Sequence, residues 1–252
     1  MTKILAITNQ KGGVGKTTTS VNLAASLAAS GKRILLVDLD PQANATMGSG
    51  TNKQTVKTTV YHVLLGDAAV QAARITGTQG KYDLIPANRD LAGAEVEMVD
   101  LPQREARLKA ALEAIGHDYD YILIDCPPAL NLLTLNGLCA AHAVMIPMQC
   151  EYYALEGLSD LVNTIKRVRN NFNPTLRIEG LLRTMFDPRN ILAQQVSDQL
   201  QKHFGDKVYR TVIPRNIRLA EAPGFGLPVL YHDAQSKGAL AYLELAKEIL
   251  GG

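Results

Sequence analysis

The chain has 252 residues, and its 46% hydrophobic and 20% charged residues are the balance of a soluble globular protein, which excludes an intrinsically disordered chain. No uncharged apolar run approaches the roughly 18 residues of a membrane-spanning helix, which excludes an integral membrane protein. The formal net charge of +2 indicates no class of partner by itself, and three cysteines without metal-ligand spacing favour a reducing, cytoplasmic compartment.

Strand-like apolar runs alternate with amphipathic helical stretches along the chain. We expect a strand at residues 4–8 and a helix at residues 16–30, which Gly31 ends because glycine readily takes a left-handed conformation. Further strands are expected at residues 33–38, 82–85, 121–125, 143–148 and 177–184. Further helices are expected at residues 91–99, 104–115, 132–141, 155–171, 191–204 and 237–250. This order predicts an α/β fold in one domain, residues 1–252, with a doubly wound, mainly parallel sheet and helices on both faces.

A glycine-rich loop follows the first expected strand and leads directly into the first helix. It reads Gln10-Lys11-Gly12-Gly13-Val14-Gly15-Lys16-Thr17-Thr18. Glycines let the backbone wrap around phosphate oxygens, and the N-terminus of the following helix adds unpaired N–H donors. Lys16 is placed to reach the β- and γ-phosphates, and the Thr17 hydroxyl to ligate Mg²⁺. The usual P-loop pattern has glycine where this chain has Gln10, and Lys11 is an additional lysine, but the context still predicts a nucleoside-triphosphate site.

Carboxylates end two of the expected strands. Asp38 and Asp40 lie two residues apart, and Pro41 stops the strand there. Asp125 follows four largely apolar residues, as in a Walker B strand. Ligands of such sheets lie beyond the carboxyl ends of the strands, so these carboxylates are expected near the metal and the attacking water.

Several separated motifs resemble one family. The loop from Lys11 to Thr18, with Asp38-Leu39-Asp40-Pro41-Gln42-Ala43-Asn44 and Asp125-Cys126-Pro127-Pro128, resembles the deviant-Walker ATPases of the ParA/MinD group. Met185-Phe186-Asp187-Pro188-Arg189 and Ile213-Pro214-Arg215-Asn216-Ile217-Arg218-Leu219-Ala220-Glu221-Ala222-Pro223 are similar to its chromosome- and plasmid-partitioning ParA (Soj) branch. The resemblance covers essentially the whole chain.

The resemblance implies a slow ATP hydrolase that uses ATP and Mg²⁺ as a switch. Its ATP-bound form would dimerise face to face and bind double-stranded DNA without sequence specificity. Hydrolysis, stimulated by a ParB-like centromere-binding protein, would release it. The protein would then lie in the cytoplasm on the nucleoid, with no membrane partner.

The resemblance also implies roles for individual residues. Lys11 would reach across the dimer to the other subunit's phosphates, as an arginine finger does, and Gly12 would lie where the two nucleotides face each other. Lys16 would hold the phosphates, Thr17 and Asp125 the metal, and Asp40 the attacking water. The remaining nucleotide contacts would come from Gly13, Val14, Gly15 and Thr18, and from the adenine-contacting Pro214 and Asn216.

Two arginines match basic positions that the ParA branch uses for DNA, namely Arg189 and Arg218. Between residues 160 and 218 the chain carries eleven Lys/Arg and five Asp/Glu, so this region is locally basic. Lys166, Arg167 and Arg169 are expected to extend the patch. The apolar run Asn190-Ile191-Leu192-Ala193 departs from the family pattern next to Arg189.

Three other interpretations stay open at this point. A MinD-like membrane-associated regulator shares the P-loop, but the last expected helix carries Glu244 and Glu248 rather than a basic face. A metabolic member of the group would need a cysteine cluster, and only Cys126 lies near a motif. A nucleotide-sensing scaffold without hydrolysis would not need Asp40 and Asp125. Because the chain begins at its first expected strand, we expect no N-terminal helix-turn-helix domain and no sequence-specific DNA binding.

Overall fold

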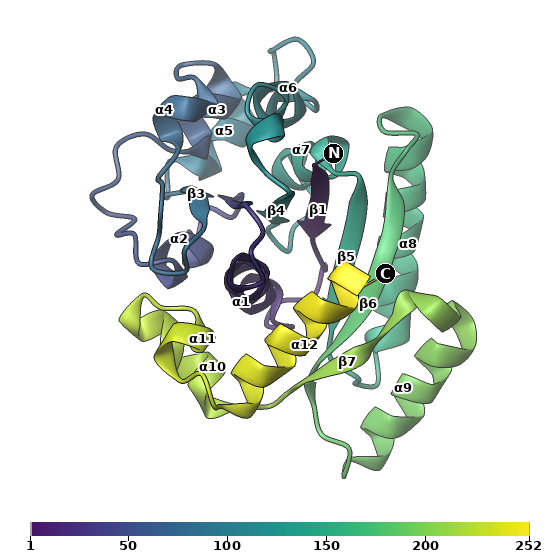
Figure 1. Cartoon of the computed structure of the whole chain (residues 1–252). Coiled ribbons are helices and arrows are strands. Elements are labelled where there is room, and N and C mark those ends of the chain that lie inside the picture. The colour runs from purple at the N-terminus through teal and green to yellow at the C-terminus, as the bar shows by residue number, and fades with distance from the viewer. Residues whose placement is uncertain (1, 252) are drawn as a thin grey trace.

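Seven strands form one sheet in which every neighbouring pair is parallel (Figure 1). The computed structural model describes residues 2–251. The strands are β1 (Lys3–Ile7), β2 (Ile34–Asp38), β3 (Asp83–Ile85), β4 (Tyr121–Asp125), β5 (Ala143–Met148), β6 (Arg177–Phe186) and β7 (Val208–Pro214). Their order is β3-β2-β4-β1-β5-β6-β7, so the chain starts in the middle of the sheet and extends it first to one side and then to the other. The predicted doubly wound α/β fold is confirmed.

Helices connect the strands and cover both faces of the sheet (Figure 1). The longer ones are α1 (Lys16–Ala29), α7 (Leu132–Ala140), α8 (Ala154–Asn171), α9 (Ile191–Phe204) and α12 (Lys237–Gly251). The shorter ones are α2 (Asn44–Gly48), α3 (Val60–Leu65), α4 (Val70–Ala73), α5 (Leu91–Glu97), α6 (Arg107–Glu113), α10 (Ile217–Glu221) and α11 (Val229–His232). No helix within residues 2–251 combines the length and apolar character needed to cross a bilayer.

Two apolar cores lie on opposite faces of the sheet because successive side chains of a strand point to opposite sides. On β1, Leu5 and Ile7 join the core formed with α1 and α12, whereas Ala6 joins the core formed with α3 and α5–α9. Leu36 and Leu35 of β2 divide in the same way. The central strands are therefore buried on both faces, which explains their nearly continuous apolar sequence.

The structure differs from the sequence-based expectation mainly at the far edge and in the short helices. β7 is missing from the expected strands, although Val208, Tyr209, Val212 and Ile213 are strong strand formers. β6 continues to Phe186, and α6 covers only Arg107–Glu113 of the expected 104–115. Helices of four to six residues, such as α4 and α3, are too short to produce a helical period in the sequence.

Candidate active site

The loop between β1 and α1 has the geometry of an anion site. Gly13 and Gly15 have φ angles of +73° and +87°, a conformation that other residues rarely adopt. Gly15 is the N-cap of α1, no side chain caps the helix, and its first turn carries no acidic residue. The backbone N–H groups and the positive end of the helix dipole are therefore available to an anion such as a phosphate.

Lys16 lies inside this loop. Its side chain is buried, and its ammonium donates a hydrogen bond of 3.1 Å to the carbonyl oxygen of Lys11, across the loop. Burial lowers the pKa of Lys16, while the nearby carboxylates of Asp125 and Asp40 raise it. The Lys16 ammonium therefore lies beside the loop where phosphate oxygens would lie.

Asp125 ends β4 between two other strand ends and is fully buried. Its two carboxylate oxygens accept hydrogen bonds from Thr17 Oγ1 and Ser20 Oγ, each at 2.8 Å. Thr17 and Asp125, which the sequence assigns to the metal, are therefore in direct contact. Sequence analysis missed Ser20, although it lies three residues after Thr17 and so on the same face of the helix.

Asp38 and Asp40 lie at the same end of the sheet but have different surroundings. Asp38 is fully buried and accepts hydrogen bonds of 2.7 Å from both the backbone N–H and the hydroxyl of Thr46. Asp40 is partly exposed, and its carboxylate accepts the N–H of Gln42 at 2.9 Å. Asp38 is therefore committed to the fold, whereas Asp40 keeps an oxygen open to water.

The donors present at this end of the sheet suit Mg²⁺. Asp38 lies opposite Asp125 in the register of β2 and β4. Burial and the negative charge of Asp38 raise the pKa of Asp125 to about 8, although the hydrogen bonds from Thr17 and Ser20 lower it. A divalent cation stabilises such carboxylates in their charged forms. Mg²⁺ commonly takes one or two protein oxygens and completes its shell with phosphate oxygens and water, and Thr17 with Asp125 meets that demand.

Lys11 points away from the loop and forms an ion pair with Glu151, which follows β5. Its backbone is fixed by Asn9, whose side-chain oxygen accepts the Lys11 N–H at 3.0 Å and whose amide donates to the Pro147 carbonyl at 2.8 Å. The Lys11 side chain is 45% exposed, in contrast to that of Lys16. Sequence analysis missed Glu151, although its position just beyond a strand end was a usable signal.

A cavity of about 300 Å³ adjoins the loop and is lined largely by apolar atoms. It contains Pro214 and Asn216, as expected for a base pocket, together with Thr18 and Gly15 of the loop. Thr184 of β6 also lines it and donates a 2.7 Å hydrogen bond to the carbonyl oxygen of Val14, tying the loop to the strand. The size and apolar lining suit a planar base.

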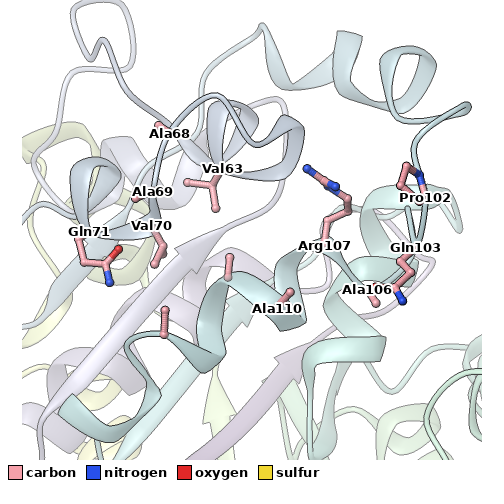
Figure 2. Close-up of a pocket in the computed structure, with 12 residues that line it drawn as sticks. Val63, Ala68, Ala69, Val70, Gln71, Pro102, Gln103, Ala106, Arg107 and Ala110 are labelled. Carbon is pink, nitrogen blue, oxygen red and sulfur yellow. The ribbon is translucent and has the colours of Figure 1, made fainter.

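Another cavity, of about 320 Å³, lies between α3–α4 and α6 and lacks such chemistry (Figure 2). Half of its lining residues are alanine, and its charged residue Arg107 donates to the backbone carbonyls of Leu64 and Leu65 at 2.6 and 3.0 Å. Arg107 therefore caps the C-terminal end of α3, and these hydrogen bonds account for its position in the cavity.

The two predicted DNA-binding arginines lie beyond the ends of β6 and β7, the same end of the sheet as the loop. Each is already paired within the chain. Arg189 forms a two-pronged pair with Asp187, at 3.0 and 2.8 Å. Arg218 contacts Glu221 at 2.8 Å and Asp233 at 3.3 Å. Sequence analysis did not foresee these acidic partners.

The expected extension of this patch onto α8 is wrong. Helix α8 starts at the loop end of the sheet and returns the chain to the start of β6 (Figure 1). Lys166 lies twelve residues along this helix, or about 18 Å from its start, and Arg167 and Arg169 lie further still. These three residues are exposed, but at the other end of the molecule from Arg189 and Arg218.

Comparison with known proteins gives consistent matches. Residues 2–178 match the family model described as AAA domain. The chain is 58% identical to the sporulation initiation inhibitor protein Soj of Bacillus subtilis, over 99% of this chain and 98% of that one. It is 52% identical to the chromosome partitioning protein ParA of Caulobacter vibrioides, over 98% and 94% of the two chains. A crystal structure of cobyrinic acid a,c-diamide synthase from Mycobacterium smegmatis with bound ADP and magnesium is 41% identical, with a TM-score of 0.87 over 99% of this chain and 94% of that one.

Proposed function

This chain belongs to the ParA/Soj family of chromosome-partitioning ATPases, and from that membership we propose that it is a DNA-partitioning switch driven by ATP-dependent dimerisation. As a member of that family it hydrolyses ATP with Mg²⁺. ATP binding would drive dimerisation and non-specific DNA binding. Hydrolysis stimulated by a ParB-like protein would then release the DNA, so that the protein cycles on and off the nucleoid in the cytoplasm.

The observation that carries this proposal is the opposite orientation of the two loop lysines. Lys16 is buried within the loop, so it serves the nucleotide of its own subunit. Lys11 is partly exposed and pairs with Glu151 outside the loop, so an anion that approaches from outside can replace Glu151 as its partner. A γ-phosphate of a second subunit is such an anion, and ADP does not offer it. ATP would thereby favour the dimer.

The proposed hydrolytic roles use the residues at this end of the sheet. Thr17 and Asp125 would hold Mg²⁺, which would supply positive charge against the phosphate oxygens. Lys16 stabilises negative charge on the oxygens of the transferred phosphoryl group. Asp40, whose carboxylate is partly exposed, orients the attacking water. Lys11 of the second subunit would complete the positive charge around the transferred γ-phosphoryl group, which would couple hydrolysis to the dimer.

DNA binding is assigned to Arg189 and Arg218, which would contact phosphates after leaving their acidic partners. Dimerisation doubles a weak monomer surface, so the nucleotide state controls DNA affinity. The test is a gel shift on non-specific duplex DNA with no nucleotide, with ADP or with ATP–Mg²⁺. Wild type should shift DNA with ATP only, and Arg218→Glu should abolish the shift while ATP still binds.

Arg167→Glu is the matched control, because it makes the same charge change on an exposed arginine at the other end of the molecule. It should leave the shift intact. A shift in all nucleotide states, or equal loss in both variants, would contradict the proposed surface. No shift in any state, with ATP still hydrolysed, would favour a MinD-like regulator and direct the next experiment to liposomes.

The structure bears on the other interpretations as well. The apolar face of α12 is packed against α1 and β7 through Tyr242, Leu245 and Ile249, so it is not free to bind a membrane. The three cysteines Cys126, Cys139 and Cys150 are buried and unpaired, so none is presented for a surface metal cluster. The partitioning relatives are also more similar in sequence than the amide synthase is.

A further inference from the structure

We propose that Ser20 is a positioning residue of the magnesium site, because its hydroxyl holds one oxygen of Asp125 while Thr17 bonds the other. The inference rests on the proposed role of Asp125 at the metal. Ser20 would orient this carboxylate in every nucleotide state, including before the metal arrives.

The contact pattern divides the two carboxylate oxygens between two hydroxyl groups. Thr17 Oγ1 donates to Asp125 Oδ2 and Ser20 Oγ to Asp125 Oδ1, both at 2.8 Å. Ser20 and Asp125 are both fully buried. Among residues 2–251, no other side chain donates a hydrogen bond to this carboxylate. Each oxygen therefore depends on a single side-chain donor within a region that excludes water.

The Ser20 hydroxyl has a second acceptor in reach, the carbonyl oxygen of Lys16 at 3.0 Å. A serine hydroxyl has one proton, and in a helix it often gives that proton to the carbonyl four residues earlier. Here the Asp125 oxygen, at 2.8 Å, is closer than the Lys16 carbonyl oxygen, at 3.0 Å, and it becomes a still stronger acceptor when the carboxylate is charged. The proton therefore goes to Asp125, and the lone pairs of Ser20 face away from it.

The hydroxyl groups of Thr17 and Ser20 would have different partners when nucleotide binds. The oxygen of Thr17 is the one placed to ligate the metal, so the position of Thr17 then depends on the metal and the phosphates. Ser20 lies one turn further into α1, away from the loop, and its bond to Asp125 does not depend on them. Residues that orient a ligand group commonly account for a ten- to hundredfold change in metal affinity.

The helix provides a control for this serine. Ser26 lies on α1, is as buried as Ser20, and its hydroxyl has no hydrogen-bond partner among residues 2–251. Ser26→Ala therefore removes a buried hydroxyl from the same helix without touching Asp125. Any effect of Ser20→Ala beyond that of Ser26→Ala belongs to the bond with the carboxylate.

The experiment measures ADP affinity of the full chain by calorimetry, in saturating Mg²⁺ and in EDTA. We expect Ser20→Ala to reduce the gain in affinity that Mg²⁺ confers by about tenfold, with an unchanged affinity in EDTA. Ser26→Ala should behave as wild type. Ser20→Cys keeps a side chain of similar shape with a weaker hydrogen-bond donor, so it should also reduce the gain in ADP affinity that Mg²⁺ confers. This variant keeps the test possible if Ser20→Ala does not fold.

Asp125→Asn separates the two levels of the argument. If it leaves the Mg²⁺ gain unchanged, the proposed metal site itself is wrong. If Asp125→Asn reduces the gain and neither Ser20 variant does, the role of Ser20 is overturned. A serine with a merely structural role would lower the melting temperature and weaken ADP binding equally with and without Mg²⁺, which also counts against the proposal.

Discussion

At the scale of single residues, side chains of the same type near the loop differ in their contacts because their surroundings differ. Lys16 is buried and bonded inside the loop, whereas Lys11 is exposed and paired with Glu151 outside it. Asp38 is fully buried and fixed by Thr46, whereas Asp40 is partly exposed. The residue type alone therefore does not define the role.

Asp40→Ala should retain ATP binding and lose hydrolysis. The carboxylate is not committed to the nucleotide-binding loop, and loss of a water-orienting group typically costs about 10²- to 10⁴-fold in rate. Phosphate release and ATP affinity should be measured on the same preparation. Lys16→Ala is the contrasting variant and should lose ATP binding itself. Wild-type turnover in Asp40→Ala would remove Asp40 from this role.

Gly12→Val should fold and bind ATP as a monomer yet fail to dimerise. A Cβ on Gly12 would meet no atom of its own chain within 4 Å, so the fold tolerates a side chain there. The proposed dimer does not tolerate this side chain, because the second nucleotide would approach at Gly12. Light scattering in the presence of ATP would measure dimer formation. Gly13→Val is the comparison, since its φ of +73° makes any side chain strained even in the monomer.

At the scale of elements, short polar contacts join segments that are distant in sequence. Glu248 of α12 accepts the backbone N–H groups of Arg210 and Thr211 on β7, at 2.7 and 3.0 Å, and the Thr211 hydroxyl at 2.7 Å. Arg218 of α10 joins this helix to the segment after α11 through Asp233. These contacts fix the last helices against the edge of the sheet and the base pocket.

Glu248→Gln should destabilise the fold by about 1–2 kcal/mol at neutral pH. Burial alone would raise the pKa of Glu248, but the hydrogen bonds from Thr211 and Arg210 outweigh it and lower the pKa. The carboxylate therefore contributes stability above its unfolded-state pKa, and this contribution is lost as pH falls through the native value. Melting temperatures between pH 7 and 3 should fall less steeply in Glu248→Gln than in wild type. Glu244→Gln, on the exposed side of α12, should not change the slope.

Glu221→Gln combined with Asp233→Asn should increase DNA affinity without nucleotide. Arg218 now lies between two carboxylates, so its surroundings carry a net negative charge that a DNA phosphate must displace. Removing both acids should raise affinity by about three- to tenfold at low salt. Fluorescence anisotropy on duplex DNA measures it. Glu244→Gln removes a negative charge away from Arg218 and should have little effect on DNA affinity. An equal gain in affinity in Glu244→Gln would show that only the overall charge matters.

At the scale of the whole molecule, the parallel sheet brings the candidate nucleotide and DNA residues to one end. The loop after β1, Asp40 after β2, Asp125 at the end of β4, and the arginines after β6 and β7 all lie beyond carboxyl ends of strands. The nucleotide pocket and the proposed DNA surface are therefore neighbours, because Asn216, the N-cap of α10, lines the pocket and Arg218 lies in α10. This neighbourhood gives a short route by which nucleotide can affect DNA binding.

The salt dependence of DNA binding tests the size of this surface. Two arginines from each protomer of a dimer give a slope of about −3.6 for log affinity against log salt, or about a hundredfold loss between 50 and 200 mM. Arg218→Ala should halve the slope. Affinity that is independent of salt would rule out the electrostatic account, and a much steeper slope would show that further basic residues take part.

Much of the fold follows from local signals. The central strands are long apolar runs, and the loop glycines, Lys16 and Thr17 stand at positions that only a strand–loop–helix unit explains. The edge strand β7 escapes prediction because its burial pattern does not alternate regularly, and the short helices escape it because four to six residues are too few to show a helical period. The pairings of Glu221 and Asp233 with Arg218 escape it because a surface acid has no local sign of its partner. The position of Glu151 beyond β5 indicated the site, but its pairing with Lys11 had no such sign.

The sequence by itself determined the fold class, the phosphate loop and the carboxylates at the strand ends, because these depend on backbone conformation and on residues close along the chain. Only the tertiary structure decided which groups meet: Ser20 with Asp125, Lys11 with Glu151, Thr184 with Val14, and the pairing of Arg218. It also separated α8 from the arginine surface. These contacts join residues up to 170 positions apart, and the order of strands in the sheet sets them, not the residues that flank them in sequence.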